Sequence, residues 1–339
     1  MAPEQETMAR TTATTRARPV LRVLLSCIGR RVELAQTFRT AARRLAIGLE
    51  LHGTDVSPTA PGIHCVDLPH QVVPISRRRY IADLLELVEQ SQIDLLVPTI
   101  DTELPKLAAA RDRFKRYGCT VLISSTDVIA IGRDKLQTFE ALRSADIDTP
   151  TTWPAAEALR RRRHRFPYQV KPRHGSAGLG NYRVDDLEAL RFWAKRVPDA
   201  VVQQFVRGDE FTLDVYAGLD GRVRCVVPRQ RLEVRSGEVQ KARVVKDPRL
   251  IEIGKRVVES IDGCIGVITV QCIRTPQGRI RVIEINPRFG GGVPLAIHAG
   301  ADFPRWLMAG LLGRRCRIAL DGYRDGVYML RYDQSVFLE

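Results

Sequence analysis

Three oxygen-bearing side chains near the end of the chain are spaced so that they could hold a metal ion. Gln271 lies in one run rich in β-branched residues, Glu284 and Asn286 lie in the next, and a turn around Gln277-Gly278 separates the runs. If the runs form a β-hairpin folded symmetrically about that turn, Gln271 lies opposite Glu284 and Asn286 follows on the same face. Oxygen ligands favour Mg2+ over Zn2+. The spacing therefore predicts a magnesium site on the hairpin.

The neighbours of this predicted site are apolar. Val267, Ile273 and Val282 are expected to leave the patch half dry, where a carboxylate such as Glu284 is costly unless a cation neutralises it. Magnesium held by so few protein groups keeps waters and completes its shell with substrate phosphates. The second ligand to expect is thus a nucleoside triphosphate.

A glycine-rich loop between two predicted strands, 168–172 and 181–184, offers a place for the phosphates. Lys171 puts a positive charge at the mouth of the loop, and glycines let backbone N–H groups approach phosphate oxygens. Taken alone, such a loop is more often simple hairpin chemistry than a phosphate cradle. The loop residues concerned are Gly175, Ser176, Ala177 and Gly178.

Neither common nucleotide motif is present in the sequence. There is no G-x-x-x-x-G-K-[ST], which excludes a Walker loop, and the glycines at 175–180 precede a strand rather than a helix, which disfavours a dinucleotide fingerprint. Lys135 is predicted at the start of a helix, where the helix N-terminus favours phosphate. By itself, Lys135 would be read as a solvated surface lysine.

These residues and their order resemble the ATP-grasp superfamily, most closely its carbamoyl-phosphate-synthase-like branch, over about residues 20 to 313. The resemblance implies that Lys135 and Lys171 hold the α and β phosphates of ATP, with the glycine loop closing over the reacting groups. It also implies that the segment from Gln204 through Phe205 to Val206 lies beside adenine, and that Glu210 binds the ribose.

The resemblance places Mg2+, for which Mn2+ could substitute, on the same Gln271, Glu284 and Asn286 that the hairpin geometry selects. Position 271 is Gln where many relatives carry an acidic residue, so this site has one negative charge fewer. Arg288 would lie near the phosphoryl group being transferred.

The polar segment 229–241 resembles the part of the family fold that lines the acceptor side of the triphosphate. This suggests Lys241 as a catalytic residue, together with Arg231, although a surface hairpin is an equally good interpretation. The glycines at 290–292 would permit a close approach of backbone to a ligand.

The remaining segments must form lobes that bring these residues together, because 339 residues exceed the about 250 to 300 that one core serves. Alternating apolar strands and amphipathic helices from Val20 to Ser124 predict a doubly wound parallel sheet. Ligands of such sheets bind beyond the carboxyl ends of the strands, which makes 27–31, Asp55 and 99–103 candidate edges of the substrate site. Asp101 or Thr102 could instead cap the following helix.

The predicted fold class is α/β, with a pre-ATP-grasp parallel-sheet lobe at 20–125 followed by a two-lobed α+β ATP-grasp fold at 126–313. The ATP-grasp part divides into a lid at about 140–207 and a catalytic lobe at about 208–313. Residues 1–19 are too polar to offset their ordering entropy and are predicted to be a disordered tail. Residues 314–339 are expected to pack on the body of the protein.

Composition narrows the class of protein. With no apolar run of 18 residues and no signal-peptide pattern, the chain is expected to be cytoplasmic and without membrane contact. Seven cysteines without a C-x-x-C pair favour reduced core residues over disulfides or zinc ligands. The net charge of +14 makes nucleic acid a partner to consider. The run from Arg160 to Arg165 has no interleaved recognition pattern, so we read it as a solvated face and expect no nucleic-acid binding.

The resemblance predicts an enzyme, an ATP-dependent ligase that joins a small-molecule carboxylate to an amine or ammonia. The carboxylate would attack the γ-phosphorus, and the amine would displace phosphate from the acyl phosphate, which gives an amide, ADP and phosphate. The first alternative is carboxyphosphate chemistry on bicarbonate, and the second is a non-catalytic ATP-binding module. Relatives often dimerise, so a homodimer is also compatible with the resemblance. The sequence does not name the acid or the amine.

Overall fold

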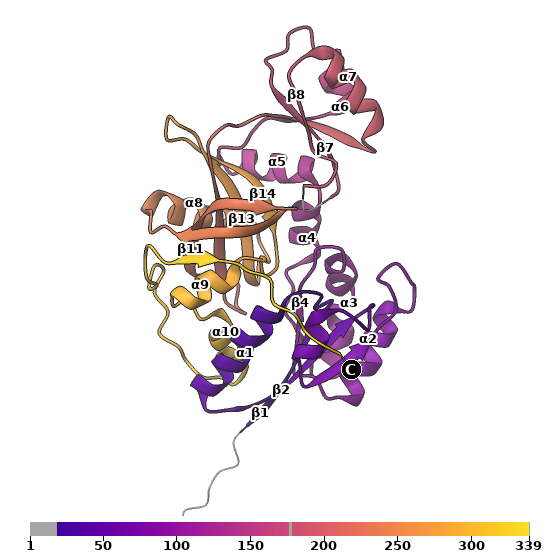
Figure 1. The fold of residues 1–339 in the computed structure, drawn as a ribbon, viewed down its shortest axis with the longest axis vertical. Coiled ribbons are helices and arrows are strands. Elements are labelled where there is room, and N and C mark those ends of the chain that lie inside the picture. The colour runs from indigo at the N-terminus through magenta and orange to yellow at the C-terminus, as the bar shows by residue number, and fades with distance from the viewer. Residues whose placement is uncertain (1–18, 176–177, 339) are drawn as a thin grey trace, which may run out of the picture.

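The computed structural model describes residues 19–175 and 178–338, which form three lobes (Figure 1). The predicted tail lies outside this part except for Pro19, and so do Ser176 and Ala177 of the glycine loop. None of the described helices is both long enough and apolar enough to cross a membrane.

The N-terminal lobe is a parallel sheet covered by helices on both faces. Its strands pair in the order β3-β2-β1-β4-β5, and every pair is parallel. Helix α1 packs on one face through Phe38, and α2 and α3 pack on the other through Tyr80 and Phe114. The elements are β1 (Val20–Ser26), α1 (Val32–Leu45), β2 (Gly48–Asp55), the 3-10 turn η1 (Pro61–Cys65), β3 (Leu68–Gln71), α2 (Tyr80–Gln90), β4 (Leu95–Pro98), α3 (Leu104–Arg116) and β5 (Thr120–Val121).

The doubly wound parallel sheet predicted from the sequence is therefore confirmed. Strand β3 was not predicted, because Leu68-Pro69-His70-Gln71 shows neither alternation nor β-branched residues and lies at the edge of the sheet.

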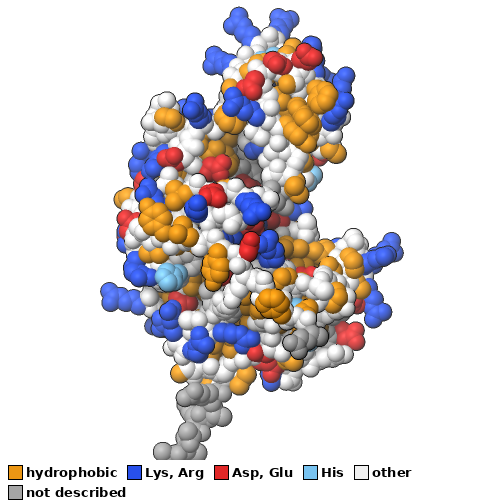
Figure 2. Space-filling model, in the orientation of Figure 1, with side chains coloured by type: hydrophobic (Ala, Val, Ile, Leu, Met, Phe, Trp, Pro, Cys, Tyr) orange, Lys and Arg blue, Asp and Glu red, His pale blue; other side chains and the backbone are white. Residues whose placement is uncertain are grey.

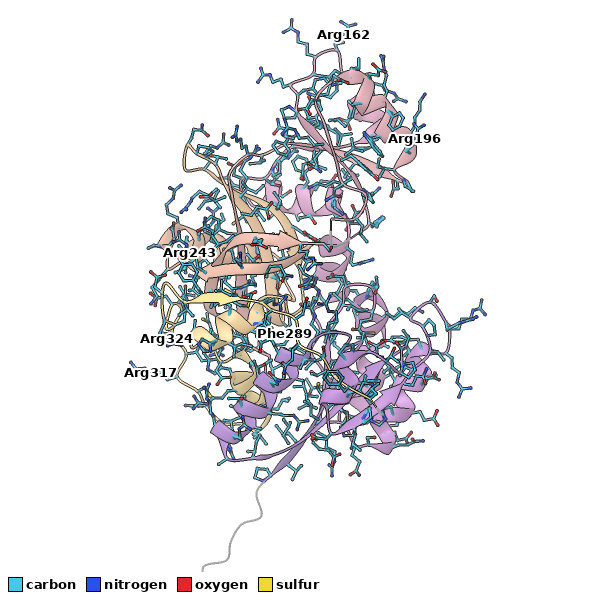
Figure 3. All side chains as sticks on the ribbon, in the orientation of Figure 1. Arg162, Arg196, Arg243, Phe289, Arg317 and Arg324 are labelled. Carbon is cyan, nitrogen blue, oxygen red and sulfur yellow. The ribbon has the colours of Figure 1, made fainter. Side chains whose placement is uncertain are left out.

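The lid projects from the body and has a small core of its own, which includes Tyr168, Val170 and Leu190 (Figure 1). Its sheet has the order β6-β9-β7-β8. Figure 2 shows Lys and Arg side chains gathered over its outer end, and Figure 3 shows Arg162 of the arginine run pointing away from the body. The elements from the linking helices onward are α4 (Thr126–Arg133), α5 (Lys135–Ser144), β6 (Thr152–Pro154), α6 (Ala155–Arg160), β7 (Tyr168–Pro172), β8 (Tyr182–Val184), α7 (Leu187–Arg196) and β9 (Ala200–Gln204).

The chain passes from the lid to the catalytic lobe at a glycine that the geometry requires. Gly208 has φ +158°, and a Cβ there would lie 2.7 Å from the carbonyl carbon of Arg274. No side chain fits at this point, so the residue that joins the lid to the catalytic lobe must be glycine.

The catalytic lobe is an antiparallel sheet of order β14-β13-β10-β11-β12-β15. Helix α8 packs on it through Leu250 and Val257, while α9 and α10 pack with α1 in a core shared with the N-terminal lobe. Strand β15 adds the C-terminal segment to the sheet edge. The elements are β10 (Asp209–Ala217), β11 (Val223–Arg235), β12 (Glu238–Val244), α8 (Pro248–Glu259), β13 (Gly266–Arg274), β14 (Ile280–Asn286), α9 (Val293–Ala299), α10 (Phe303–Leu311) and β15 (Tyr328–Leu330).

Candidate active site

A cavity of about 1170 Å³ lies where the three lobes meet. The lid contributes Lys171 and Gln203, the catalytic sheet contributes the hairpin β13–β14, and the N-terminal lobe contributes the loop 99–102 that follows β4. This loop was predicted as an edge of the substrate site, since it lies at the carboxyl end of a parallel strand.

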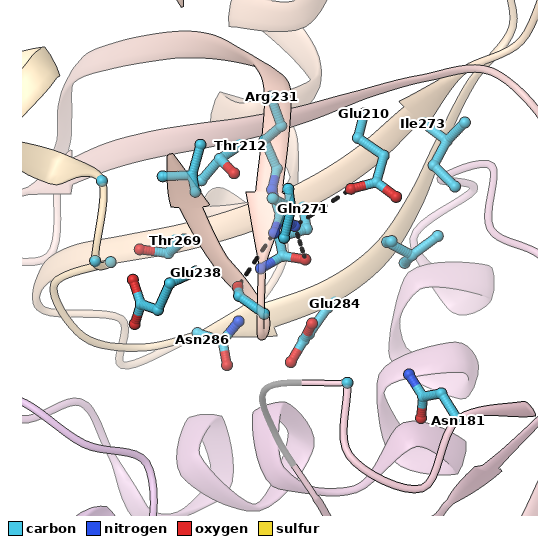
Figure 4. Close-up of a pocket in the computed structure, with 18 of the residues that line it drawn as sticks. Asn181, Glu210, Thr212, Arg231, Glu238, Thr269, Gln271, Ile273, Glu284 and Asn286 are labelled. Carbon is cyan, nitrogen blue, oxygen red and sulfur yellow. Dashed lines mark hydrogen bonds and ion pairs between the residues drawn. The ribbon is translucent and has the colours of Figure 1, made fainter. Parts of the chain in front are cut away.

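The hairpin brings the predicted metal-binding side chains together. Gln271 lies opposite Glu284, and Thr269 lies opposite Asn286. Figure 4 shows Gln271, Glu284 and Asn286 facing the same space in the cavity, with Asn181 of the lid nearby. The predicted juxtaposition of the three side chains is thus present.

The predicted symmetry of the hairpin is wrong by one residue near the turn. Arg274 pairs with Ile280 and Cys272 with Val282, so the turn is centred on Gln277 rather than between Gln277 and Gly278. A bulge then leaves Ile283 as an extra residue on β14, and beyond it the predicted pairing holds.

The apolar surroundings also differ from the prediction. Of the three neighbours expected, Ile273 lines the cavity, whereas Val267 and Val282 are buried in hydrophobic cores. Ile283, brought round by the bulge, lines the cavity as well. The patch is therefore half dry, but through a partly different set of residues.

Two lysines lie close enough to Glu284 for its charge to act on them. Burial lowers the pKa of Lys171 to about 8, while the carboxylates of Glu284 and Glu210 act in the opposite direction. Burial also lowers the pKa of Lys135, and Glu284 again opposes the shift. Both positive charges are thus held in a partly dry site, where a polyanion would relieve their cost.

Hydrogen bonds fix both lysines. Nζ of Lys171 donates to Oε1 of Gln203 at 2.8 Å, and Gln203 in turn donates to Thr152 at 2.9 Å. Lys135 is the first residue of α5, as predicted, and its Nζ donates to the carbonyl of Gly175 at 3.2 Å. Lys135 and Gly175 are not among the residues that line the cavity, while Gly178 of the same loop is.

The segment predicted to contact adenine lines the cavity from Gln204 through Phe205 and Val206 to Glu210. The side chain of Gln204 is engaged elsewhere, since its Oε1 accepts from the Thr151 amide and from Arg281, both at 3.3 Å. Glu210 faces Arg231 at 3.4 Å.

Arg288 joins the catalytic lobe to the N-terminal lobe inside the cavity. Its Nε and Nη2 donate to the two carboxylate oxygens of Asp101 at 2.9 and 2.6 Å. Asp101 thus holds the guanidinium in one orientation.

A buried carboxyl group stabilises the loop that carries Asp101. Glu103 is fully buried, and burial raises its pKa. It accepts from Tyr80 Oη at 2.8 Å and from the Thr99 amide at 3.1 Å. The alternative that Asp101 or Thr102 caps α3 is wrong, because Glu103 occupies the N-cap position and makes no side-chain cap.

Comparison with known proteins agrees with this architecture. Residues 23–122 match the model of the PylC-like N-terminal domain, and residues 132–292 match the model of the ATP-grasp domain. The chain is an ATP-grasp protein.

Solved structures share the fold of this ATP-grasp protein. The biotin carboxylase domain of Hydrogenobacter thermophilus 2-oxoglutarate carboxylase, a dimer with MgADP, ADP and bicarbonate, has a TM-score of 0.72 at 17% identity, covering 91% of this chain and 73% of its own. N5-carboxyaminoimidazole synthetase from Staphylococcus aureus has a TM-score of 0.70 at 16% identity, with coverage of 90% and 81%. L-amino acid ligase from Bacillus licheniformis has a TM-score of 0.67 at 18% identity, with coverage of 86% and 74%.

The acceptor end of the ATP-grasp cavity differs from the prediction. Lys241 does not line the cavity; it is about half exposed and pairs with Glu233 at 2.6 Å. Segment 229–241 forms the hairpin β11–β12, from which Arg231 lines the cavity as predicted, together with Arg229 and Glu238, which were not singled out. We therefore do not keep a catalytic role for Lys241.

The glycines after Arg288 make room for side chains of the protein itself. A Cβ at Gly291 would lie 2.5 Å from Nη1 of Arg31, and one at Gly292 would collide with Arg229. Arg229 forms a buried ion pair with Asp214, with Nη2 to Oδ1 at 3.0 Å. The run of glycines thus lets two arginines approach the cavity wall.

Three residues of this site were missed as functional candidates or named only as part of a loop: Gln203, Arg31 and Asp101. Gln203 follows two valines on β9 and precedes Gln204, so no alternation of polar and apolar residues marks it as a residue that faces the cavity. The Arg288–Asp101 pair joins residues 187 apart, and no local pattern could reveal it.

Proposed function

We propose that this ATP-grasp protein is an ATP-dependent ligase that joins a carboxylate to an amine through an acyl phosphate. The observation that carries the proposal is the cavity in which Glu284, with Gln271 and Asn286, shares one space with Lys171 and Arg288. Carboxylate and amide oxygens on one side and half-buried cations around them match a metal–triphosphate ligand. The L-amino acid ligase that shares the fold supports carbon–nitrogen bond formation.

The residues present fit Mg2+ when a nucleotide supplies further ligands. Among residues 19–175 and 178–338, no cluster of three or more His, Cys, Asp or Glu side chains could hold a metal by itself. The hairpin offers one carboxylate and two amide oxygens, of which Oε1 of Gln271 accepts a long hydrogen bond from Nη1 of Arg231 at 3.4 Å. This is a weak set that phosphate oxygens and waters would complete. Mg2+ held by Gln271, Glu284 and Asn286 would supply charge neutralisation on the transferred phosphoryl group.

The chain's own residues have distinct tasks in the proposed reaction. Lys171, inside the cavity, and Lys135, at its margin beside Gly175, bind the α and β phosphates, and Gln203 orients Lys171 by its hydrogen bond. Gln204, Phe205 and Val206 lie along adenine. Glu210 holds the ribose, and Gly178 with its loop excludes water.

Arg288, fixed by Asp101, stabilises charge on the phosphoryl group as a carboxylate oxygen attacks the γ-phosphorus and ADP leaves. The amine nitrogen then attacks the acyl carbon, and phosphate leaves with the electrons of the C–O bond and the proton that the nitrogen loses. No nucleophile of the protein is needed.

The test is a screen of carboxylic acids, bicarbonate included, for ADP release with hydroxylamine as a small amine that traps acyl phosphates as hydroxamates. We expect one class of acid to give ATP-dependent hydroxamate. Glu284→Gln should slow this reaction by on the order of a hundredfold, as loss of a group that stabilises the transition state does.

Glu233→Gln is the matched control, because Glu233 is an exposed carboxylate on the same sheet, outside the cavity. It should keep the wild-type rate. Wild-type turnover by Glu284→Gln, or ADP release with no acid preferred over buffer, would refute the proposal.

A further inference from the structure

Arg31 and Glu238 face each other at the acceptor end of the cavity without a close contact. Nη2 of Arg31 and Oε1 of Glu238 are 3.6 Å apart, which is beyond a normal hydrogen bond. Both residues line the cavity, and their side chains are 20% and 46% exposed. Arg31 comes from the start of α1, and Glu238 from the start of β12, so the pair spans two lobes.

The charges around Arg31 leave it short of an anion. Glu238 is shared with Arg331, whose Nη1 lies 3.4 Å from Oε2. The carboxylate of Asp101 accepts from two nitrogens of Arg288, Nε and Nη2. Burial lowers the pKa of Arg31, and the neighbouring charges of Arg288 and Arg331 lower it further against the effect of Glu238. Binding of one more negatively charged group beside Arg31 is therefore electrostatically favourable.

We propose that Arg31 and Glu238 bind the amine substrate as an α-amino acid zwitterion, with its carboxylate on Arg31 and its ammonium group on Glu238. This inference rests on the ligase function proposed above and names the class of amine. A guanidinium and a carboxylate that face each other loosely can exchange their mutual contact for the two ends of a zwitterion.

Other ligands fit this pair less well. A phosphate dianion would meet Glu238 as a like charge, and ammonia or a simple alkylamine would leave Arg31 without its anion. Gly291 beneath the pair lets Arg31 lie against the backbone, because any side chain there would displace it.

The position also suits the second step of the reaction. The ammonium group transfers one proton to the carboxylate of Glu238, and the freed lone pair of nitrogen attacks the acyl carbon. The new C–N bond forms as the C–O bond to phosphate breaks. Phosphate leaves with that electron pair and takes the second proton that the nitrogen loses, as hydrogen phosphate.

The first experiment measures binding with both enantiomers of the common amino acids, in the presence of Mg2+ and a non-hydrolysable ATP analogue. Thermal shift finds the best binder, and calorimetry then compares it with its carboxamide and its N-acetyl derivative. We expect each derivative to bind at least about tenfold more weakly, as loss of a hydrogen bond to a charged group does.

Two variants test which residue binds the carboxylate and which binds the ammonium group of the amino acid. Arg31→Met should weaken binding of the amino acid to the affinity of its carboxamide, and should leave the affinity for the carboxamide unchanged. Glu238→Gln should weaken binding of the amino acid to the affinity of its N-acetyl derivative, and should leave the affinity for that derivative unchanged. Arg243→Met is the control, since Arg243 lies on the same strand as Glu238, bonded to Gln230 and outside the cavity.

The proposal is overturned if no amino acid of either hand binds, if Arg31→Met weakens acid and amide equally, or if inorganic phosphate alone shows the Arg31-dependent binding. The hydroxylamine assay separates this from the ligase function, because hydroxylamine has no carboxylate to place on Arg31. Hydroxamate formation without amino-acid binding would contradict only the amino-acid site at Arg31 and Glu238. Amino-acid binding without acid-dependent ADP release would contradict the ligase function.

Discussion

Raising the pH from 7 to 9.5 is expected to weaken nucleotide binding by about thirtyfold, because Lys171 must be protonated to hold phosphate. Burial lowers the pKa of this lysine to about 8 in the free protein. Below pH 8 the positive charge is present before the nucleotide arrives. Above pH 8 each binding event must first take up a proton, and affinity falls by up to about tenfold per pH unit, or about 1.4 kcal/mol.

The neighbours of Lys171 set the position of this fall. Glu284 and Glu210 raise its pKa, whereas Lys135 lowers it. Glu284→Gln should therefore move the onset of the fall to lower pH. Lys171→Arg should flatten the profile, because a guanidinium stays charged throughout the range.

The assay is calorimetry of Mg2+ and a non-hydrolysable ATP analogue at constant ionic strength, repeated in buffers with different ionisation enthalpies. Proton uptake on binding should rise from near zero at pH 7 to nearly one at pH 9.5. A dissociation constant that stays level over this range, or an equal fall in Lys171→Arg, would refute the reasoning.

Three further predictions follow from contacts in and below the site. Mg2+ should bind at least about tenfold more weakly without a nucleotide than with one, since the hairpin supplies a single carboxylate; calorimetry with and without the ATP analogue checks this, and tight binding to the free protein would contradict it. Asp214→Ala should lower the free energy of unfolding by about 3 to 5 kcal/mol, because it leaves the charge of Arg229 buried and unpaired; urea unfolding measures it, and a loss under about 1 kcal/mol would show the pair to be dispensable. Asp101→Asn should lower kcat about 10- to 100-fold with little change in the KM for ATP, because Arg288 loses its bidentate partner; a change confined to KM would place Arg288 in ground-state binding instead.

The sequence predicted local geometry well where apolar and polar residues repeat with the period of a strand or a helix. The strand period placed Gln271 opposite Glu284, and alternating apolar strands and helices predicted the parallel sheet, both of which the structure contains. The family predicted from the order of these motifs is confirmed by the two matched models. The bulge at Ile283 was not predictable, because it contains no glycine or other residue type that would mark it.

The acceptor end of the cavity was harder to predict, because it depends on which face of a hairpin turns inward. Lys241 and Arg231 lie in one polar segment, yet only Arg231 faces the cavity. Bulges between Arg231 and Val234 shift the register of this hairpin, so alternation along the sequence does not reveal the inward face. Pairs such as Arg31 and Glu238 cannot be predicted without the whole fold, since their residues come from separate lobes.

The central claim is that the β13–β14 hairpin holds a divalent ion against the nucleotide. Electron paramagnetic resonance of Mn2+ with the ATP analogue tests it directly, since Mn2+ can replace Mg2+. The wild-type chain and the Glu233→Gln control should bind Mn2+ equally in the presence of nucleotide, and Glu284→Gln should bind it at least about tenfold more weakly. Equal binding of Mn2+ and nucleotide by all three would contradict the account.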